Sequence, residues 1–137
     1  MGLMLSNPFA RTREDHRAEV AEDYVELIHR LGRDGDVRTT DLAEALGVAQ
    51  PTVTKALDRL ERSGLVVVNP RRSVGLTEEG MGLARRMEER HGLIVRFLES
   101  LGVPPDVAEL DAEGIEHHVS ESTQRAMKAF LKQRRAS

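Results

Sequence analysis

Two carboxylates and an imidazole lie close together in the stretch 111–120. In a helix, Glu113, Glu116 and His117 stand at positions i, i+3 and i+4, and this spacing brings the three side chains to one face. Carboxylates placed in this way repel each other. A divalent metal ion would remove that repulsion and use all three groups as ligands, so the trio predicts a metal site. A solvated charged face with a stray histidine is the alternative.

Apolar residues near this trio favour the metal site over the solvated face. Val107, Leu110 and Ile115 supply apolar neighbours, so we expect the trio to be partly buried. Gly114 lies inside the expected helix, where a glycine costs about 1 kcal/mol relative to alanine. A close neighbour of the helix at this point, or a packing constraint, would explain it.

Composition narrows the class of protein. The chain has 137 residues, enough for one or two small domains, and it has no cysteine, which excludes disulfides and thiolate metal sites. The first residues lack the basic and apolar regions of a signal peptide, and the longest apolar run, residues 65–68, is far too short to span a membrane. We therefore expect a cytoplasmic protein that has no membrane partner.

Charge is unevenly distributed along the chain. The formal net charge is −3, which alone would argue against a nucleic-acid partner. Between residues 50 and 76, however, five basic residues stand against two acidic ones, Asp58 and Glu61. The basic residues are Lys55, Arg59, Arg62, Arg71 and Arg72. A local basic surface of this kind is what DNA binding requires, whatever the sum over the chain.

The basic region contains a helix-turn-helix pattern. Thr40 is the expected N-cap of a first helix that ends at Gly47, and residues 48–50 make a short turn. Pro51 then takes the first position of a second helix, which runs to about Arg62. Two short helices joined by so tight a turn are typical of a helix-turn-helix.

The second helix has an apolar face and a polar face. Val53, Leu57 and Leu60 should pack inward. The opposite face carries hydrogen-bond donors that suit phosphates and base edges, although an ordinary basic surface is the alternative. These donors are Thr52, Lys55 and Arg59.

A basic-tipped hairpin follows the second helix. Residues 65–69 and 74–76 are strand-like, and the turn between them carries Arg71 and Arg72. A helix-turn-helix followed by such a hairpin is a winged helix-turn-helix, whose wing arginines contact phosphate or the minor groove.

Helices are expected on both sides of the winged region, so the fold is mainly α. Helical spacing predicts a helix over 11–31 before it and a long helix from the cap Thr77 to Ser100 after it. A further helix starts at Pro104, and Ser120 caps a final helix over 121–134. The three helices that follow the hairpin are too few to enclose much core by themselves, so we expect a homodimer.

The chain resembles the diphtheria toxin repressor family, in its manganese transport regulator branch. The matching segments are residues 22–26, 50–55, 89–91 and 113–118. They extend from near residue 18 to the C-terminal part of the chain, and the last segment is the most specific. The resemblance implies a winged helix-turn-helix domain over 1–76 and a helical metal-binding and dimerisation domain over 77–137.

The resemblance also implies which residues bind metal and DNA. It implies two Mn²⁺ ions per subunit, for which Fe²⁺, Co²⁺ or Cd²⁺ can substitute. The implied metal ligands are Asp23, Glu26, His91, Glu113, Glu116 and His117. The predicted DNA-binding residues are Gln50, Pro51, Thr52, Thr54, Lys55, Arg59, Arg71 and Arg72. One departure is Val95, where relatives commonly have a glutamate, so an ancillary metal site that uses this position is not expected here.

The implied function is a manganese-dependent transcriptional regulator that represses manganese uptake genes. It would bind duplex operator DNA as a homodimer, with Mn²⁺ fixing the spacing of the two recognition helices. No enzymatic activity and no small-molecule substrate are expected. A metal-independent winged-helix regulator would leave the six ligands unexplained, and a dinuclear metallohydrolase would need a nucleophile or general base that is not evident beside them.

Overall fold

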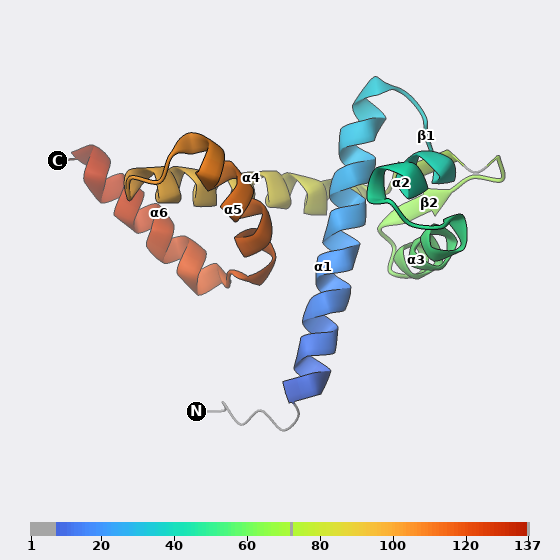
Figure 1. Ribbon diagram of the computed structural model, residues 1–137, viewed down its shortest axis with the longest axis horizontal. Helices are drawn as coiled ribbons and strands as arrows, with labels where there is room; N and C mark the ends of the chain where they lie inside the picture. Colours follow the sequence, from blue (N-terminus) through green and yellow to red (C-terminus); the bar gives the residue numbers. More distant parts are fainter. Residues whose placement is uncertain (1–7, 72, 137) are drawn as a thin grey trace. The chain divides into compact units, whose positions relative to one another are not determined.

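Six α-helices and a three-stranded sheet form the residues that the computed structural model describes, 8–71 and 73–136 (Figure 1). In chain order the elements are α1 (Pro8–Leu31), β1 (Val37–Arg38), α2 (Thr39–Leu46), α3 (Gln50–Arg62), β2 (Val66–Val68), β3 (Ser73–Leu76), α4 (Glu78–Ser100), α5 (Pro105–Ile115) and α6 (Glu121–Ala136). Short 3₁₀ turns follow α1 at Gly32–Asp34 and α5 at Glu116–His118. The chain divides into two units within α4, one ending at Ala84 and the other beginning at Arg85.

The core of the first unit lies where α1, α2 and α3 meet the sheet. All three helices contribute fully or nearly fully buried apolar side chains, and so does each strand. These residues are Tyr24, Ile28, Val37, Leu42, Val53, Leu57, Leu60, Val66 and Val74. The inward face predicted for α3 is thus confirmed, and burial of this apolar surface is the main force that holds the helix-turn-helix in place.

The turn between α2 and α3 depends on local backbone signals. Gly47 has a φ of 69°, a left-handed conformation that suits glycine, and it ends α2 as predicted. The predicted cap at Thr40 is wrong, because Thr40 lies inside α2. The helix begins at Thr39 and its N-cap is Arg38, whose N–H donates to the carboxylate of Asp41 at 2.8 Å. Pro51 is the second residue of α3, not the first, and its missing N–H is harmless in either position.

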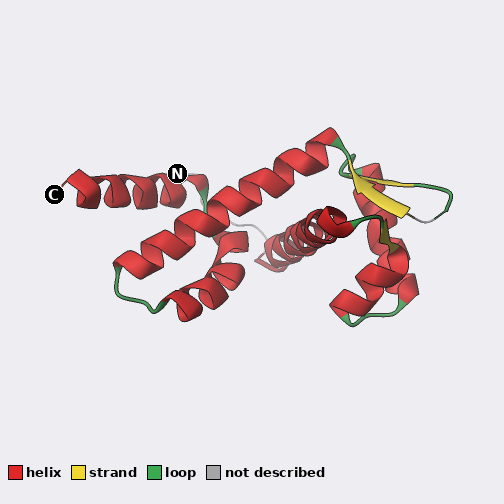
Figure 2. Cartoon of the chain, turned by 90° about the horizontal axis from the view of Figure 1, so that it is seen from above, coloured by secondary structure: helices red, strands yellow, loops and turns green. Residues whose placement is uncertain are grey.

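The sheet has the strand order β1-β3-β2 and is antiparallel throughout. The β2–β3 hairpin was predicted, and it extends away from the helices in Figure 2. Strand β1, which pairs Val37 with Val74, was missed because two residues carry no readable alternation. On the free edge of β2, the Val68 N–H donates to the carboxylate of Glu61 at 3.2 Å.

The start of α4 is fastened to the segment that precedes the hairpin. Thr77 is the N-cap, as predicted: its hydroxyl oxygen accepts the Gly80 N–H at 3.0 Å and donates to the Gly64 carbonyl at 2.6 Å. Gly80 allows the close approach, because a Cβ at this position would lie 2.1 Å from the carbonyl oxygen of Leu65. A side chain at residue 80 would therefore force the helix and the hairpin apart.

The second unit consists of the rest of α4 together with α5 and α6. Its buried apolar residues include Met87, Leu93 and Ile94 of α4 and Ala108 and Ala112 of α5. The rings of Phe97 and Phe130 meet edge to face with centroids 5.5 Å apart, which joins α6 to α4. Ser120 caps α6 by accepting the Thr123 N–H at 3.2 Å, as predicted.

Two expectations about α5 are wrong. The helix ends at Ile115 and the next three residues form a 3₁₀ turn, so Glu113 does not share one continuous α-helix with Glu116 and His117. The expected partial burial of the trio is confirmed for Glu116 and His117, although the apolar neighbours Val107, Leu110 and Ile115 that suggested it are themselves exposed. Gly114 has no close neighbour either, since a Cβ there would meet nothing within 4 Å. Within the described part of the chain, no helix combines the length and the apolar character needed to cross a membrane.

Candidate metal centre and nucleic-acid interface

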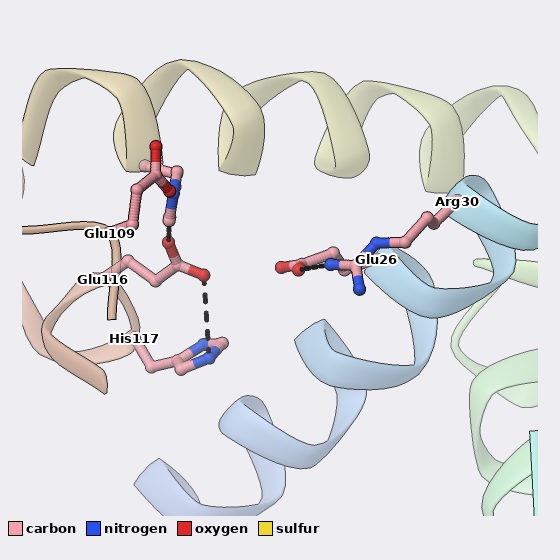
Figure 3. Close-up of polar contacts among 6 residues, drawn as sticks. Glu26, Arg30, Glu109, Glu116 and His117 are labelled. Carbon is pink, nitrogen blue, oxygen red and sulfur yellow. Dashed lines mark hydrogen bonds and ion pairs between the residues drawn. The ribbon is translucent and has the colours of Figure 1, made fainter. Parts of the chain in front are cut away.

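Glu116 is a buried carboxylate at the centre of a polar cluster in the second unit (Figure 3). Its side chain is only 2% exposed, although it stands in the 3₁₀ turn after α5. One carboxylate oxygen, Oε2, is 2.6 Å from Nδ1 of His91 on α4. The other, Oε1, is 4.0 Å from Nε2 of His117, whose side chain is also nearly buried. A carboxylate in this position would be costly without such partners, so the fold depends on the histidines around it.

The ring of His91 contacts a second carboxylate through its other nitrogen. Nε2 lies 2.7 Å from Oε2 of Glu109 on α5 (Figure 3). Burial favours a lower pKa for His91, but the hydrogen bonds to Glu109 and Glu116, together with the negative charges of both carboxylates, outweigh it and raise the pKa above its usual value. We call His91, Glu109, Glu116 and His117 the Glu116 cluster.

Glu109 was not identified from the sequence. It lies four residues before Glu113, a spacing that places the two on one face of α5, and this signal was available. Glu113 itself is exposed. The structure therefore brings Glu116 and His117 of the predicted trio together with His91, and replaces Glu113 by Glu109 as the carboxylate of α5 that contacts the cluster.

The two predicted ligands of the first unit lie on α1. Asp23 is exposed, whereas Glu26 is half-buried and its carboxylate accepts a hydrogen bond from the Arg30 guanidinium at 2.6 Å (Figure 3). The two residues are separated by one turn of the helix. The carboxylate of Glu26 is thus already engaged by a cation, in the way that a metal ion would engage it.

The donor chemistry of the Glu116 cluster fits a divalent metal ion. As the described residues stand, no three His, Cys, Asp or Glu side chains are grouped so that they could hold an ion. Nevertheless, one buried carboxylate faces an imidazole nitrogen with each of its oxygens, and carboxylate and imidazole are ligands that Mn²⁺, Fe²⁺ and Zn²⁺ accept. Among the side chains that the structure describes, Glu116 carries the only buried carboxylate.

The predicted DNA-binding residues of α3 lie on its solvent side. All six are exposed, opposite the buried Val53, Leu57 and Leu60. They are Gln50, Pro51, Thr52, Thr54, Lys55 and Arg59. In the wing, Arg71 is exposed at the hairpin turn, which is closed by the Asn69 N–H donating to the Ser73 carbonyl at 2.9 Å. Arg72 lies outside the described residues.

Two family models match the chain, and together they cover most of it. The first is described as "Iron dependent repressor, N-terminal DNA binding domain" and matches residues 16–74. The second is described as "Iron dependent repressor, metal binding and dimerisation domain" and matches residues 77–136. The exposed helix α3 falls in the first match, and the Glu116 cluster in the second.

Individual relatives are similar over most of their length. The transcriptional regulator MntR of Escherichia coli O6:H1 is 51% identical over 123 residues, which is 89% of this chain and 79% of that protein. MntR of Bacillus subtilis is 38% identical over 100 residues, covering 72% of this chain and 70% of that one.

Among solved structures, a manganese-dependent transcriptional repressor in complex with manganese matches with a TM-score of 0.70 and 33% identity. The match covers 82% of this chain and 52% of the other. The manganese regulator SloR matches with a TM-score of 0.67 and 30% identity, over 82% of this chain and 53% of that chain. This chain thus spans about half the length of these solved chains.

Proposed function

The chain belongs to the iron dependent repressor family, in its branch of manganese-dependent transcriptional regulators, and from this premise we propose that it represses manganese uptake genes by binding duplex operator DNA as a homodimer. Members of this family regulate transcription and are not enzymes. We propose no catalytic role and no small-molecule substrate for this chain.

Glu116 is the strongest support for metal dependence. Its carboxylate is 2% exposed and lies between two imidazoles. These groups are hard and intermediate metal ligands, and none of them contains sulfur. A buried ion pair often stabilises a fold no better than apolar packing does, so a purely structural role does not require a charge at this position. A cation that Glu116 binds gives the charge a role.

We propose that six residues supply the ligands of up to two Mn²⁺ ions per subunit. His91, Glu116 and His117 would be supplied by the second unit, together with the exposed Glu113. The others would be Asp23 and Glu26 of α1. Four carboxylates and two imidazoles suit Mn²⁺, and they also admit Fe²⁺, Co²⁺ or Cd²⁺. Bound metal would supply a positive charge that these ligands share, and would favour the arrangement of the domains that binds DNA.

The proposed DNA interface consists of the exposed side of α3 and the tip of the wing. Lys55, Arg59 and Arg71 supply positive charge for phosphates, and Gln50, Thr52 and Thr54 supply groups that can read base edges. Arg72 belongs to the proposed wing contact by sequence. We assign DNA binding to residues 1–76, and metal binding and dimerisation to residues 77–137.

Exposed apolar residues support the homodimer. Leu101, Val107, Leu110 and Ile115 all belong to the second unit and are exposed in the single chain. A partner subunit that covers them would bury this apolar surface. In such a dimer, two recognition helices about 34 Å apart would fit successive major grooves on one face of the duplex.

Metal-dependent DNA binding tests the function directly. Duplexes selected from a random pool by the protein in the presence of Mn²⁺ would be used to measure affinity with and without the ion. For the parent chain we expect Mn²⁺ to raise affinity by about 5- to 150-fold, the usual range of coupling between two sites. The variant His117→Ala should lose this gain.

The adjacent histidine supplies the matched control. His118 is exposed, so His118→Ala should respond to Mn²⁺ as the parent does. The proposal is wrong if the parent binds the selected duplexes equally well without Mn²⁺, or if His117→Ala keeps the full response.

A further inference from the structure

The ring of His91 has a carboxylate at each of its two nitrogens. Nδ1 faces Glu116 at 2.6 Å and Nε2 faces Glu109 at 2.7 Å. An imidazole that binds a metal ion does so through one nitrogen, which must carry no proton, while the other nitrogen carries the hydrogen. The two neighbours of His91 must therefore have different roles when the ion is bound: one shares the ion, and the other accepts the remaining N–H.

The surroundings of the two nitrogens decide which carboxylate has which role. On the Nδ1 side, Glu116 is buried and its second oxygen is near His117, so several potential ligands lie together. On the Nε2 side, the side chain of Glu109 is 61% exposed. Cation ligands therefore gather at Nδ1, whereas Nε2 meets a single solvent-facing carboxylate of another helix.

We propose that Glu109 is a positioning residue for the metal centre: its carboxylate accepts the Nε2–H of His91, which leaves the lone pair of Nδ1 directed at Glu116, whose other oxygen faces His117. This inference rests on the proposed function, because it takes His91 as a metal ligand. A carboxylate that accepts the second N–H of a metal-binding histidine fixes both the tautomer and the orientation of the ring, and makes the other nitrogen a better ligand.

Packing of α5 holds Glu109 in reach of the ring. Ala108 and Ala112 are fully buried, so short side chains let this stretch of the helix lie close to its neighbours in the second unit. Glu109 follows Ala108 directly, and its Cα is placed by that contact even though the carboxylate is largely exposed. The hydrogen bond to His91 therefore joins α5 to α4 beside the proposed ligands.

Mn²⁺ titrations of two variants test the role of the carboxylate. Loss of a partner that orients a ligand usually weakens metal affinity 10- to 100-fold, and the exposure of Glu109 places Glu109→Ala near the lower limit, at about 10-fold. Glu109→Gln keeps an acceptor, its amide oxygen, and should fall between the parent and Glu109→Ala.

An acidic residue of the same helix controls for charge. Asp106→Asn removes one negative charge from the exposed first turn of α5, and should leave Mn²⁺ affinity within about twofold of the parent because exposed charges at a distance are screened. Equal affinity for Glu109→Ala and the parent would overturn the proposal, and so would equal losses in Glu109→Ala and Asp106→Asn.

The protonation of His91 gives a readout that a general loss of stability would not change. In ¹⁵N-labelled protein loaded with ¹¹³Cd²⁺, coupling between the metal and a ring nitrogen identifies the nitrogen that binds. For the parent we expect coupling to Nδ1 and a proton on Nε2. Coupling to Nε2 would overturn the proposal, because Glu109 would then lie on the side of the metal.

A third variant separates this inference from the proposed function. Glu116→Ala should lose Mn²⁺ binding if the Glu116 cluster is the metal centre. If Glu116→Ala binds like the parent, the ligand assignment fails and the positioning role fails with it. If Glu116→Ala loses binding while Glu109→Ala does not, only the role of Glu109 is rejected.

Discussion

The carboxylate of Glu26 is engaged by Arg30, one turn further along α1. If Glu26 is a metal ligand, as we propose, the guanidinium and the metal ion compete for the same oxygen atoms. The competition is weak, because the Arg30 side chain is 61% exposed and ion pairs at i, i+4 on a helix contribute about 0.3–0.5 kcal/mol. Arg30 would thus adjust the affinity of the site slightly, without preventing metal binding.

This competition predicts a gain of affinity. Replacing Arg30 by glutamine frees the carboxylate of Glu26, so Mn²⁺ should bind about twofold more tightly, the equivalent of the lost ion pair. Isothermal titration calorimetry would measure the change. Arg13→Gln, which removes the same charge from an exposed position of the same helix, should have no such effect. Weaker binding by Arg30→Gln would mean that the guanidinium supports Glu26 instead of competing with it.

At the scale of single elements, α3 exposes Lys55 and Arg59 and the wing exposes Arg71, whereas Val53, Leu57 and Leu60 of α3 are buried. Each Lys or Arg that neutralises a phosphate releases counterions, which makes affinity depend on salt. The number of such contacts can therefore be counted in solution without knowing the operator.

Salt dependence should identify the basic residues that contact phosphate. Removal of one phosphate contact should make the slope of log affinity against log salt shallower by about 0.9, and by about 1.8 in a dimer that loses one contact per subunit. We expect this change for Lys55→Ala and Arg71→Ala when anisotropy is measured over a salt series. Lys128→Ala on α6 should leave the slope unchanged. An unchanged slope for Arg71→Ala would remove the wing from the interface.

The junction between α4 and the hairpin predicts a large effect of a small substitution. In Gly80→Ala the new methyl group would lie 2.1 Å from the Leu65 carbonyl oxygen, a backbone atom that cannot turn aside. We expect the free energy of unfolding to fall by about 3 kcal/mol, the upper part of the range for overpacking. Urea denaturation followed by circular dichroism would measure it.

The same helix offers a control glycine. A methyl group at Gly92 would meet only the mobile end of the Arg96 side chain, so Gly92→Ala should stabilise the protein by up to about 1 kcal/mol through helix propensity. If Gly80→Ala is no less stable than the parent, the close approach at Leu65 does not hold in solution.

Local signals predicted most of the elements, and contacts between elements explain what was missed. Gly47 marked the end of α2, and Thr77 and Ser120 marked the starts of α4 and α6, because capping depends on neighbouring residues in the chain. Strand β1 exists only because β3 offers it an edge, which no two-residue pattern can show.

The Glu116 cluster was predicted in part for the same reason. Residue types and spacing identified Glu116 and His117, but the helix ends between Glu113 and Glu116, so spacing alone misplaced Glu113. The contact of Glu109 with His91 joins two helices that are distant in sequence. Only the packing of α5 against its neighbours determines that contact. The sequence alone could therefore offer Glu109 as one candidate among several carboxylates, but could not pair it with His91.

At the scale of the whole molecule, the single chain leaves apolar side chains of its second unit in contact with water. Leu110 is the extreme case, since the residue is 70% exposed. Isolated surface leucines are common, but here several apolar residues of one helix and its flanks are exposed together. A second copy of the chain would cover them.

A negative charge in place of Leu110 should separate the subunits. Since Leu110 is exposed, Leu110→Glu should leave the fold of the single chain intact, whereas a buried charge at the dimer interface should cost about 2 kcal/mol, or about 30-fold in the dimer dissociation constant. Sedimentation velocity over a concentration series would show it. Val67→Glu changes an exposed valine of β2 and should remain dimeric. If Leu110→Glu sediments like the parent, α5 is not part of the interface.

Strand β2 consists of three valines and lies at one edge of the sheet, because the order is β1-β3-β2. An apolar strand with one side unpaired is a template onto which a strand of another molecule could add, the first step of aggregation. The carboxylate of Glu61 accepts the outward N–H of Val68 and places a negative charge beside this edge. We therefore expect Glu61, near the end of α3, to oppose the addition of another strand at this edge.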